Sequence, residues 1–588
     1  MPWQADSYSP IDFSVLDPHW GNIDDWRALV DAIHARGMYI MLDFTVGTMG
    51  DMIGFAGHLN TSTPFSIDEY ETVWKKPRYS PWNIEEYPDF KISQEYNATC
   101  TLPVMWLDSG EIQPVDKVGC YASEFDQYGD MEAFGVHPDW NRQLSKFASV
   151  QDRLREWNPN VRAKIQVFSC LAIKALDIDA IRIDKATQVT VDALADWATH
   201  TRACAKALGK NNFFIVGEVT GGDTFGALYL GRGRSPTQRP PDNRHGVNIT
   251  SDMKQYFLRD KPRNSLDAVA FHYSVYRALS RVLGMDGNLQ VAYDAYQNPN
   301  FVEIWDNMLM SNDFLNAETG LLDPRHMYGV SNFDVFRWPS LVNGTQRVAL
   351  ASFINALVMP GIPLLYYGEE QDFYLFDNGA ANYLFGRQPM TSNTAWQRHG
   401  CYKLGSEQYF NMPLEKALLG CVDDWNSLDH FDPTSASRRM MAHFHYLRRQ
   451  IPLLVDGFQL IQRGNWTSFI TLAGSNDVPT EIGWWSVSRS RFPGQPAVNS
   501  PIDDVWMIYT NMNTTQSYNY PCSSKLWVST PYVGGTTIRN LFYPYESYTL
   551  EDSQSALNNN NRAPWVGCLP QLTLEPNSFK AFVPAANW

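Results

Sequence analysis

The sequence predicts an α/β protein whose main part is a closed barrel of parallel strands and helices, followed by an all-β domain. Three observations predict it: helices repeatedly lead into short apolar strands, acidic residues end several of those strands, and helical periodicity fades toward the C-terminus. A chain of 588 residues exceeds what one hydrophobic core usually supports, so at least one smaller domain is expected beside the barrel.

The barrel prediction depends on a repeated unit of one helix and one strand. Residues 22–37 form the first predicted helix, which is amphipathic and leads into the apolar run 38–44. The unit recurs three times, as helices and following strands at 143–175 and 179–184, 190–208 and 213–218, and 345–358 and 362–367. Strands that alternate with helices form parallel sheets, and this many units indicate a closed barrel.

Two segments depart from this pattern and define further domains. Residues 51–140 are rich in Tyr, Pro, Asn and acidic residues and are far longer than an ordinary loop, which predicts an inserted subdomain. The barrel then comprises residues 1–50 and 141–460. From about residue 480, alternating segments such as VWMIYTNM and LTLEPNSFKAFVP predict a C-terminal β-sandwich at 480–588.

Composition restricts the partners. The net charge of −16 argues against nucleic acid or an anionic membrane surface, because such a chain repels phosphate. No stretch reaches the roughly 18–20 apolar residues of a membrane helix, so we expect no membrane span. A neutral substrate fits better, and the 20 Trp residues offer flat surfaces for sugar rings, although most aromatic residues are expected to fill the core.

Cysteines and glycosylation sequons favour the secretory route and thus an extracellular or cell-wall location. Three of the possible cysteine pairs close short segments: Cys100 with Cys120, Cys401 with Cys421, and Cys522 with Cys568. The six sequons begin at Asn60, Asn97, Asn248, Asn343, Asn465 and Asn513. The start, MPWQADSYSP, is no signal peptide, so we expect an incomplete N-terminus.

The acidic residues at strand ends suggest chemistry on glycosidic bonds. Asp43, Asp184 and Glu218 each end an apolar run, where functional residues of barrels lie. Retaining chemistry needs two carboxyl groups about 5–5.5 Å apart, and adjacent strands lie about 4.8 Å apart. Arg182 stands two residues before Asp184, therefore on the same face of a strand, where its charge keeps the carboxylate ionised. Taken alone, this R-x-D motif is weak and favours a structural ion pair over a catalytic role.

Seven segments in order resemble the motifs of the α-amylase superfamily, glycoside hydrolase family 13: YSPIDFSVLDPHWG, MLDFTVGTMGD, HPDWN, AIRIDKATQ, FIVGEVTGG, GVSNFDVFRWP and MPGIPLLYYGEE. The resemblance implies a (β/α)8 TIM-type barrel with a C-terminal sandwich, and an inserted subdomain after the third strand. It implies Asp184 as the nucleophile, Glu218 as the acid/base and Asp334 as the carboxylate that holds sugar hydroxyls.

The same resemblance implies four substrate-binding residues. Arg182 matches the arginine beside the nucleophile, Asp43 the acidic residue of the first motif, and Tyr8 the tyrosine that stacks on the reacting sugar. Phe333 stands where the family has a histidine that grips this sugar, and we count it among the substrate-binding residues. Thr48 replaces a second such histidine, so the sugar must be held differently in this chain.

No cofactor is expected to be required. Asp139 in HPDWN corresponds to a calcium-ligating aspartate of the family. Gly47 stands where a further calcium ligand, an asparagine, is usual, so the resemblance does not imply a firm calcium site.

The segments DKATQVTVD, TMGDMIGF and GRQPM resemble the extracellular amylase-like domain of fungal cell-wall α-1,3-glucan synthases. By this resemblance the first barrel strands are missing from the chain. It implies a retaining glycosidase or transglycosylase that acts on α-glucan in cell-wall synthesis or remodelling. Two alternatives stay open: a secreted α-amylase or α-glucosidase acting on α-1,4-glucan, and a non-catalytic or truncated glucan-binding domain.

Overall fold

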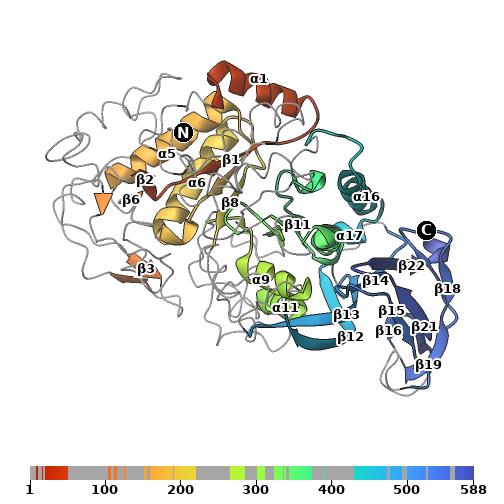
Figure 1. Cartoon of the computed structure of the whole chain (residues 1–588). Helices are drawn as coiled ribbons and strands as arrows, with labels where there is room; N and C mark the ends of the chain where they lie inside the picture. The colour runs from red at the N-terminus through yellow and green to blue at the C-terminus, as the bar shows by residue number, and fades with distance from the viewer. Residues whose placement is uncertain are drawn as a thin grey trace, which may run out of the picture. The chain divides into compact units, whose positions relative to one another are not determined.

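In the computed structural model, the structure describes residues 20–50, 104–106, 112–114, 125–126, 151–154, 159–189, 191–219, 265–284, 301–310, 324–335, 344–373, 430–472, 477–492, 500–524, 528–556 and 563–588, with Tyr8, Arg337 and a few other single residues. The chain divides into two compact units, and Figure 1 labels their elements. The first unit comprises Met1–Tyr273 and Asn307–His326, and the second comprises Ser274–Asp306 and Met327–Trp588. Each unit is described by itself.

A four-stranded parallel sheet lies at the centre of the first unit, in the order β1, β7, β8, β9. The strands are Met41–Phe44, Ala180–Ile183, Phe214–Glu218 and Ala268–Ala270. Most residues of β7, β8 and β9 are buried, which explains why AIRI, FIVGE and AVA are nearly continuous apolar runs. Because all four strands run the same way, their carboxyl ends meet at one edge of the sheet.

Three helices accompany this sheet: α1 (Ile23–His34), α5 (Pro159–Leu176) and α6 (Val191–Ala207). Asn22 begins α1, since its side chain accepts from the N–H groups of Asp24 and Asp25 while Asp25 accepts from the Asn22 N–H. Apolar side chains of the helices and strands form one core, which includes Ile165, Ile181, Leu194 and Ile215. Among the helices that the structure describes, none has the length and apolar character of a membrane span.

The predicted helix at 143–175 is only partly right. The helix α5 begins at Pro159, because proline is well suited to a first helical position. Residues Gln151–Leu154 form strand β6 instead, with backbone hydrogen bonds to β2 (Thr48–Gly50) and β5 (Phe125–Asp126). Pairing with distant segments overrides the local helical pattern there.

Short strands also lie within the predicted subdomain at 51–140. Strands β3 (Val104–Trp106) and β4 (Ile112–Pro114) pair antiparallel. The rest of that segment, apart from β5, lies outside the described residues, as do the predicted pairs of Cys100 with Cys120 and Cys401 with Cys421. A disulfide that the sequence did not indicate joins Cys170 of α5 to Cys204 of α6.

The second unit begins with helices and a short parallel pair of strands, β10 and β11. Its elements before the β domain are most of α9 (Tyr273–Val282), the first part of α11 (Phe301–Met310), β10 (Met327–Tyr328), η9 (Thr345–Arg347), α12 (Val348–Phe353), η10 (Ile354–Val358), β11 (Ile362–Pro363), η11 (Glu369–Gln371), α16 (Ala436–Gln450) and α17 (Leu453–Asp456). The predicted helix at 345–358 is therefore present as three successive helical segments. Buried Arg448 and Arg489 donate to carbonyl groups at its end, those of Ala356 and Leu357.

The C-terminal part of the second unit is an all-β domain, as predicted, but its first strand begins at Gln459, before the predicted start at residue 480. Its largest sheet is antiparallel, and its strands in order are β12 (Gln459–Thr471), β13 (Pro479–Ser490), β14 (Asp504–Thr510), β22 (Phe579–Pro584), β17 (Thr537–Asn540) and β18 (Ser547–Thr549). The smaller sheets pair β15 (Gln516–Asn519) with β21 (Gln571–Leu574), and β16 (Ser529–Val533) and β19 (Glu551–Ala556) with β20 (Trp565–Cys568). Their facing side chains form one core around Trp506 and Phe582.

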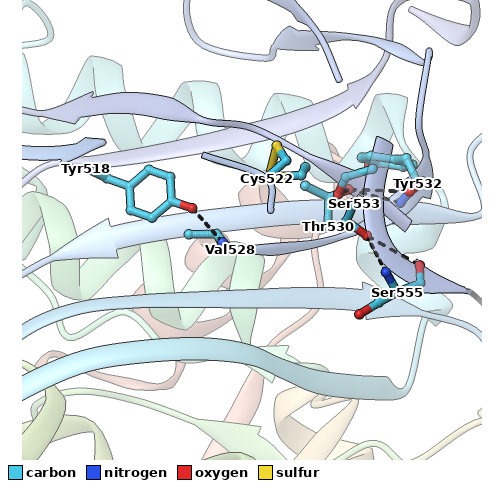
Figure 2. Close-up of a disulfide and its surroundings, with 9 residues drawn as sticks. Tyr518, Cys522, Val528, Thr530, Tyr532, Ser553 and Ser555 are labelled. Atoms are coloured by element: carbon cyan, nitrogen blue, oxygen red, sulfur yellow. Dashed lines mark hydrogen bonds between the residues drawn. A yellow bond between two sulfur atoms is a disulfide. The ribbon is translucent and has the colours of Figure 1, made fainter. Parts of the chain in front are cut away.

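The predicted disulfide between Cys522 and Cys568 is confirmed and lies in this domain. Figure 2 shows it near Tyr518, whose hydroxyl oxygen accepts from the Val528 N–H at 2.8 Å. The bridge ties the segment after β15 to the end of β20. It therefore closes a span of 46 residues within the sandwich.

Candidate active site

The parallel sheet of the first unit brings three carboxylates to its carboxyl edge. Asp43 lies on β1, Asp184 directly follows β7, and Glu218 is the last residue of β8. The pairing of β1 with β7 sets Asp43 opposite Arg182, and the Asp184 N–H donates to the Phe44 carbonyl at 2.8 Å. Three adjacent strands thus present carboxylates at one edge, which is the functional face of parallel β/α folds.

Arg182 contacts all three carboxylates. Its Nη1 donates to Asp43 Oδ1 at 2.9 Å and to Asp184 Oδ1 at 2.7 Å, and its Nη2 lies 3.1 Å from Glu218 Oε2. Burial disfavours its charge, but the negative charges of Asp43, Glu218 and Asp184 raise the pKa of Arg182 well above its usual value. The guanidinium therefore stays charged and fixes the carboxylates relative to one another.

Asp184 is ionised although it is buried, with 7% of its surface exposed. Burial raises its pKa, but the charges and hydrogen bonds of Lys185 and Arg182 outweigh burial and lower the pKa of Asp184 to about 2. Lys185 Nζ contacts Asp184 Oδ2, the carboxylate oxygen that Arg182 does not contact at hydrogen-bonding distance. Each oxygen of Asp184 thus has its own cationic partner.

Glu218 is held by several groups and is 3% exposed. Its Oε2 accepts from the Lys185 backbone N–H at 3.1 Å and contacts Arg182, and its Oε1 accepts from the Tyr273 hydroxyl at 2.7 Å. The residue before Glu218, Gly217, is restricted to glycine by its surroundings, because a Cβ at this position would lie 2.8 Å from the Ala186 Cβ. The absence of a side chain lets β8 approach the turn that follows Asp184.

Tyr8 and Asp43 form the outer part of this group. The Tyr8 hydroxyl donates to Asp43 Oδ2 at 2.6 Å, and Lys185 Nζ lies 5.5 Å from the centre of the Tyr8 ring. Burial, together with the charge of Asp43, raises the pKa of Tyr8 above its usual value, so the phenol stays protonated. Burial also raises the pKa of Asp43, against the lowering effect of Arg182.

Of the sequence-predicted site residues, five therefore lie together in the first unit: Tyr8, Asp43, Arg182, Asp184 and Glu218. Two residues that sequence reasoning missed join them. No motif of the sequence indicates a role for Lys185, although this residue directly follows the predicted nucleophile. Tyr273 follows β9, a strand of only three residues that gave no recognisable pattern.

The remaining predicted residues belong to other parts of the chain. Asp334 and Phe333 belong to the second unit, where the Asn332 side chain accepts from the Asp334 N–H at 2.7 Å. The Phe333 ring packs edge-on against Tyr366, with ring centres 6.1 Å apart. Their functional roles stay predictions. Asp139, the candidate calcium ligand, lies outside the described residues.

The chemistry of the first unit's group follows from its charges. Asp184 carries a negative charge that two cations stabilise, which suits a carboxylate that attacks or stabilises an electron-poor carbon. Glu218 stands on the adjacent strand and shares Arg182 with it. Two carboxyl groups on neighbouring strands are the arrangement that double displacement at a glycosidic carbon requires.

Comparisons with known proteins identify domains similar to parts of this chain. Residues 2–110 match the model of the α-amylase catalytic domain, and residues 458–588 match the Mok13-like glycoside hydrolase β-sandwich domain. Two solved structures of α-amylases, from Geobacillus thermoleovorans with acarbose and from H. orenii, superpose with TM-scores of 0.50 at 15% and 13% identity. They cover 99% and 98% of this chain, and 85% and 86% of their own chains. These similarities confirm the predicted fold class.

Relatives of higher identity are fungal. The chain is 47% identical to the cell wall alpha-1,3-glucan synthase mok13 of Schizosaccharomyces pombe and 45% identical to its cell wall alpha-1,3-glucan synthase ags1. The matches cover 99% and 100% of this chain but 24% of each relative, so the chain spans about a quarter of their length. An α-amylase of Streptomyces lividans is 23% identical over 77% of this chain and 42% of its own. The chain is therefore similar at residues 2–110 to the α-amylase catalytic domain, and over its whole length to one part of the cell wall α-1,3-glucan synthases.

Proposed function

We propose that this chain is a retaining α-glucan-active glycosidase or transglycosylase and serves as the amylase-like part of a cell-wall α-1,3-glucan synthase. The observation that carries the proposal is that Asp184 and Glu218, on adjacent parallel strands, share the guanidinium of Arg182. The two carboxyl groups have different surroundings, since Asp184 has two cations at its oxygens and Glu218 accepts from a tyrosine hydroxyl and a backbone N–H. Different surroundings favour different roles.

The proposed reaction has two halves. In the first, Asp184 attacks the anomeric carbon of an α-glucan, the glycosidic bond breaks, and Glu218 gives its proton to the departing oxygen. In the second, Glu218 takes a proton from the acceptor hydroxyl, whose oxygen bonds to the anomeric carbon while the bond to Asp184 breaks. Water as acceptor gives hydrolysis, and a sugar hydroxyl gives transfer. Asp334 is proposed to hold the hydroxyls of the reacting sugar.

We further propose that the chain acts on the cell-wall side of the secretory route, as a glycoprotein. Two observations support this location. The sequon residues Asn465 and Asn513 are both exposed, as carriers of N-linked glycans must be. The disulfides Cys170–Cys204 and Cys522–Cys568 fit an oxidising compartment. The substrate is proposed to be an α-glucan polysaccharide or oligosaccharide, which carries no charge that the acidic chain would repel.

Product analysis tests the proposal. The purified chain is incubated with α-1,4- and α-1,3-linked oligosaccharides, and the masses of the products are measured by mass spectrometry. Products longer than the donor would support a transglycosylase, and shorter ones alone would support a hydrolase such as a secreted α-amylase. If α-glucan binds but neither kind of product forms, the proposal fails and the chain is a glucan-binding module.

Tyr273→Phe is expected to lower kcat/KM for oligosaccharides about three- to tenfold, because it removes one hydrogen bond of about 1 kcal/mol from Glu218. The ring stays in place, so stability should change little. Steady-state kinetics measure the effect. Tyr276→Phe, on the next turn of α9, is the matched control and is expected to leave kcat/KM unchanged. Equal kinetics of Tyr273→Phe and wild type would contradict a role of this hydroxyl in positioning Glu218.

A further inference from the structure

Lys185 occupies a special place in the turn after β7. It has φ 50° and ψ 45°, in the left-handed region. A residue with a Cβ adopts this conformation at a cost of about 1–2 kcal/mol, so other interactions must stabilise it. The residue is 4% exposed, although an ammonium group loses several kcal/mol of hydration on burial unless it is paired.

The contacts of Lys185 explain why this conformation persists. Its backbone N–H donates to Glu218 Oε2 at 3.1 Å, while its ammonium contacts Asp184 Oδ2. One residue thus reaches both proposed reacting carboxylates, one through its main chain and the other through its side chain. The face of the Tyr8 ring, 5.5 Å from Nζ, gives the ammonium another favourable contact besides Asp184.

The ammonium changes the charge balance at the reacting carboxylates. Arg182 contacts Asp43, Asp184 and Glu218, and Lys185 adds a further positive charge at Asp184. A cation beside a carboxylate stabilises the ionised form relative to any form in which the oxygen is bonded, whether to a proton or to carbon. The ammonium of Lys185 therefore stabilises Asp184 as a free carboxylate, both before attack and after release, relative to the covalently bonded state between these two steps.

We propose that Lys185 is a positioning residue of the reaction, whose ammonium keeps Asp184 ready to attack and stabilises it as the leaving carboxylate when the glycosyl-enzyme breaks down. The proposal rests on the proposed function above. In the second half-reaction the acceptor oxygen bonds to the anomeric carbon, its proton passes to Glu218, and the electrons of the broken bond return to Asp184 beside Lys185. No other reactant is needed.

An α-glycosyl fluoride such as α-maltosyl fluoride is the appropriate donor for the test. Fluoride leaves without a proton from Glu218, so the pH dependence of kcat/KM reports mainly on the nucleophile. For wild type, the acid limb should lie near or below the lowest pH at which the protein is folded, because the pKa of Asp184 is about 2. Lys185→Met should move this limb upward by about one to three pH units, the usual effect of losing one neighbouring charge.

A second readout follows the covalent intermediate. In samples quenched during turnover, Lys185→Met should accumulate more glycosyl-enzyme than wild type, as detected by intact-protein mass spectrometry, because breakdown loses its cation. Lys185→Gln is a second neutral variant whose amide can still donate to Asp184, in case the apolar side chain prevents folding. Lys185→Arg keeps the charge and should keep the acid limb near that of wild type.

Lys210→Met is the matched control. Lys210 also forms ion pairs, with the exposed Asp177 and the half-buried Asp179, but these precede β7 and lie at the other end of that strand. Lys210→Met should leave the pH of the acid limb and the amount of accumulated glycosyl-enzyme unchanged. The same acid limb in wild type, Lys185→Met and Lys185→Gln, or equal shifts in Lys185→Met and Lys185→Arg, would overturn the role of Lys185. Failure of wild type to react with the fluoride, or equal reaction of Asp184→Asn, would instead overturn the proposed function.

Discussion

Asp184→Asn is expected to lower kcat/KM by at least about 10⁴-fold on every donor, which corresponds to about 5.4 kcal/mol of transition-state stabilisation. An amide oxygen is a poor nucleophile, and its neutral side chain leaves Arg182 and Lys185 without the carboxylate that both contact. Initial rates with an oligosaccharide and with α-maltosyl fluoride measure the loss. Both rates should fall together.

Glu218→Gln is the informative comparison, because it should separate the two donors. The oligosaccharide needs a proton at its leaving oxygen, so its rate should fall by about 10²–10⁴-fold. The fluoride needs none, so its first half-reaction should continue. If Asp184→Asn kept activity on the fluoride while Glu218→Gln lost it, the assigned roles would be reversed.

Asp179→Asn controls for the chemical change itself. Asp179 lies just before β7, whereas Asp184 lies just after it, and its partners are His34 and Lys210. Both substitutions replace a carboxylate that forms ion pairs near the same strand. Asp179→Asn should lower stability slightly and leave kcat/KM within about twofold of wild type, since no proposed reacting group contacts it.

Much of this site could be predicted from the sequence because its carboxylates lie at or near the carboxyl ends of short apolar strands. A continuous apolar run that ends in an acidic residue marks both the strand and its carboxyl end, as at Asp43, Asp184 and Glu218. Spacing also sufficed for Arg182, since residues two apart on a strand share a face. The positions of these four residues follow from the apolar pattern, whereas their proposed roles, and the choice of Tyr8, follow from the resemblance to the α-amylase superfamily.

The features that escaped prediction depend on contacts that periodicity does not encode. The Lys185 side chain points toward Asp184 because Lys185 has a left-handed backbone conformation. A lysine at that position does not predict this conformation. Tyr273 reaches Glu218 only because β9 pairs with β8. Cys170 lies within α5 and Cys204 within α6, so their disulfide forms only if these two helices pack together. The helical pattern of the sequence does not show that they do.

The second large effect is expected at Arg182. Arg182→Met removes the guanidinium that contacts Asp43, Asp184 and Glu218, and leaves these buried carboxylates short of positive charge. Removing one partner of a buried ion pair typically lowers stability by about 3–5 kcal/mol, because the remaining charge has lost its hydration without compensation. Hydrogen exchange of the β1, β7 and β8 amides measures this loss within the first unit, without assuming that both units unfold together.

Arg27→Met is the matched control, since Arg27 pairs with Asp24 at 3.9 Å on an exposed part of α1. Exposed pairs contribute about 0–1 kcal/mol, so this variant should remain close to wild type. Equal losses in the two variants would show that burial of the Arg182 contacts does not determine their effect.

The pH dependence of the Arg182→Met loss identifies its cause. Arg182 lowers the pKa of Asp43 and of Asp184, so its removal raises both in the folded state. Asp43, whose pKa burial already raises, then binds more protons in the folded variant than in the unfolded chain above the ordinary aspartate pKa, so the stability of the variant falls as pH rises through that window. The loss should therefore shrink on acidification. Asp43→Asn should partly rescue Arg182→Met at neutral pH, because it removes one uncompensated charge. A loss that neither acid nor Asp43→Asn relieves would mean that Arg182 stabilises the sheet by packing rather than by charge.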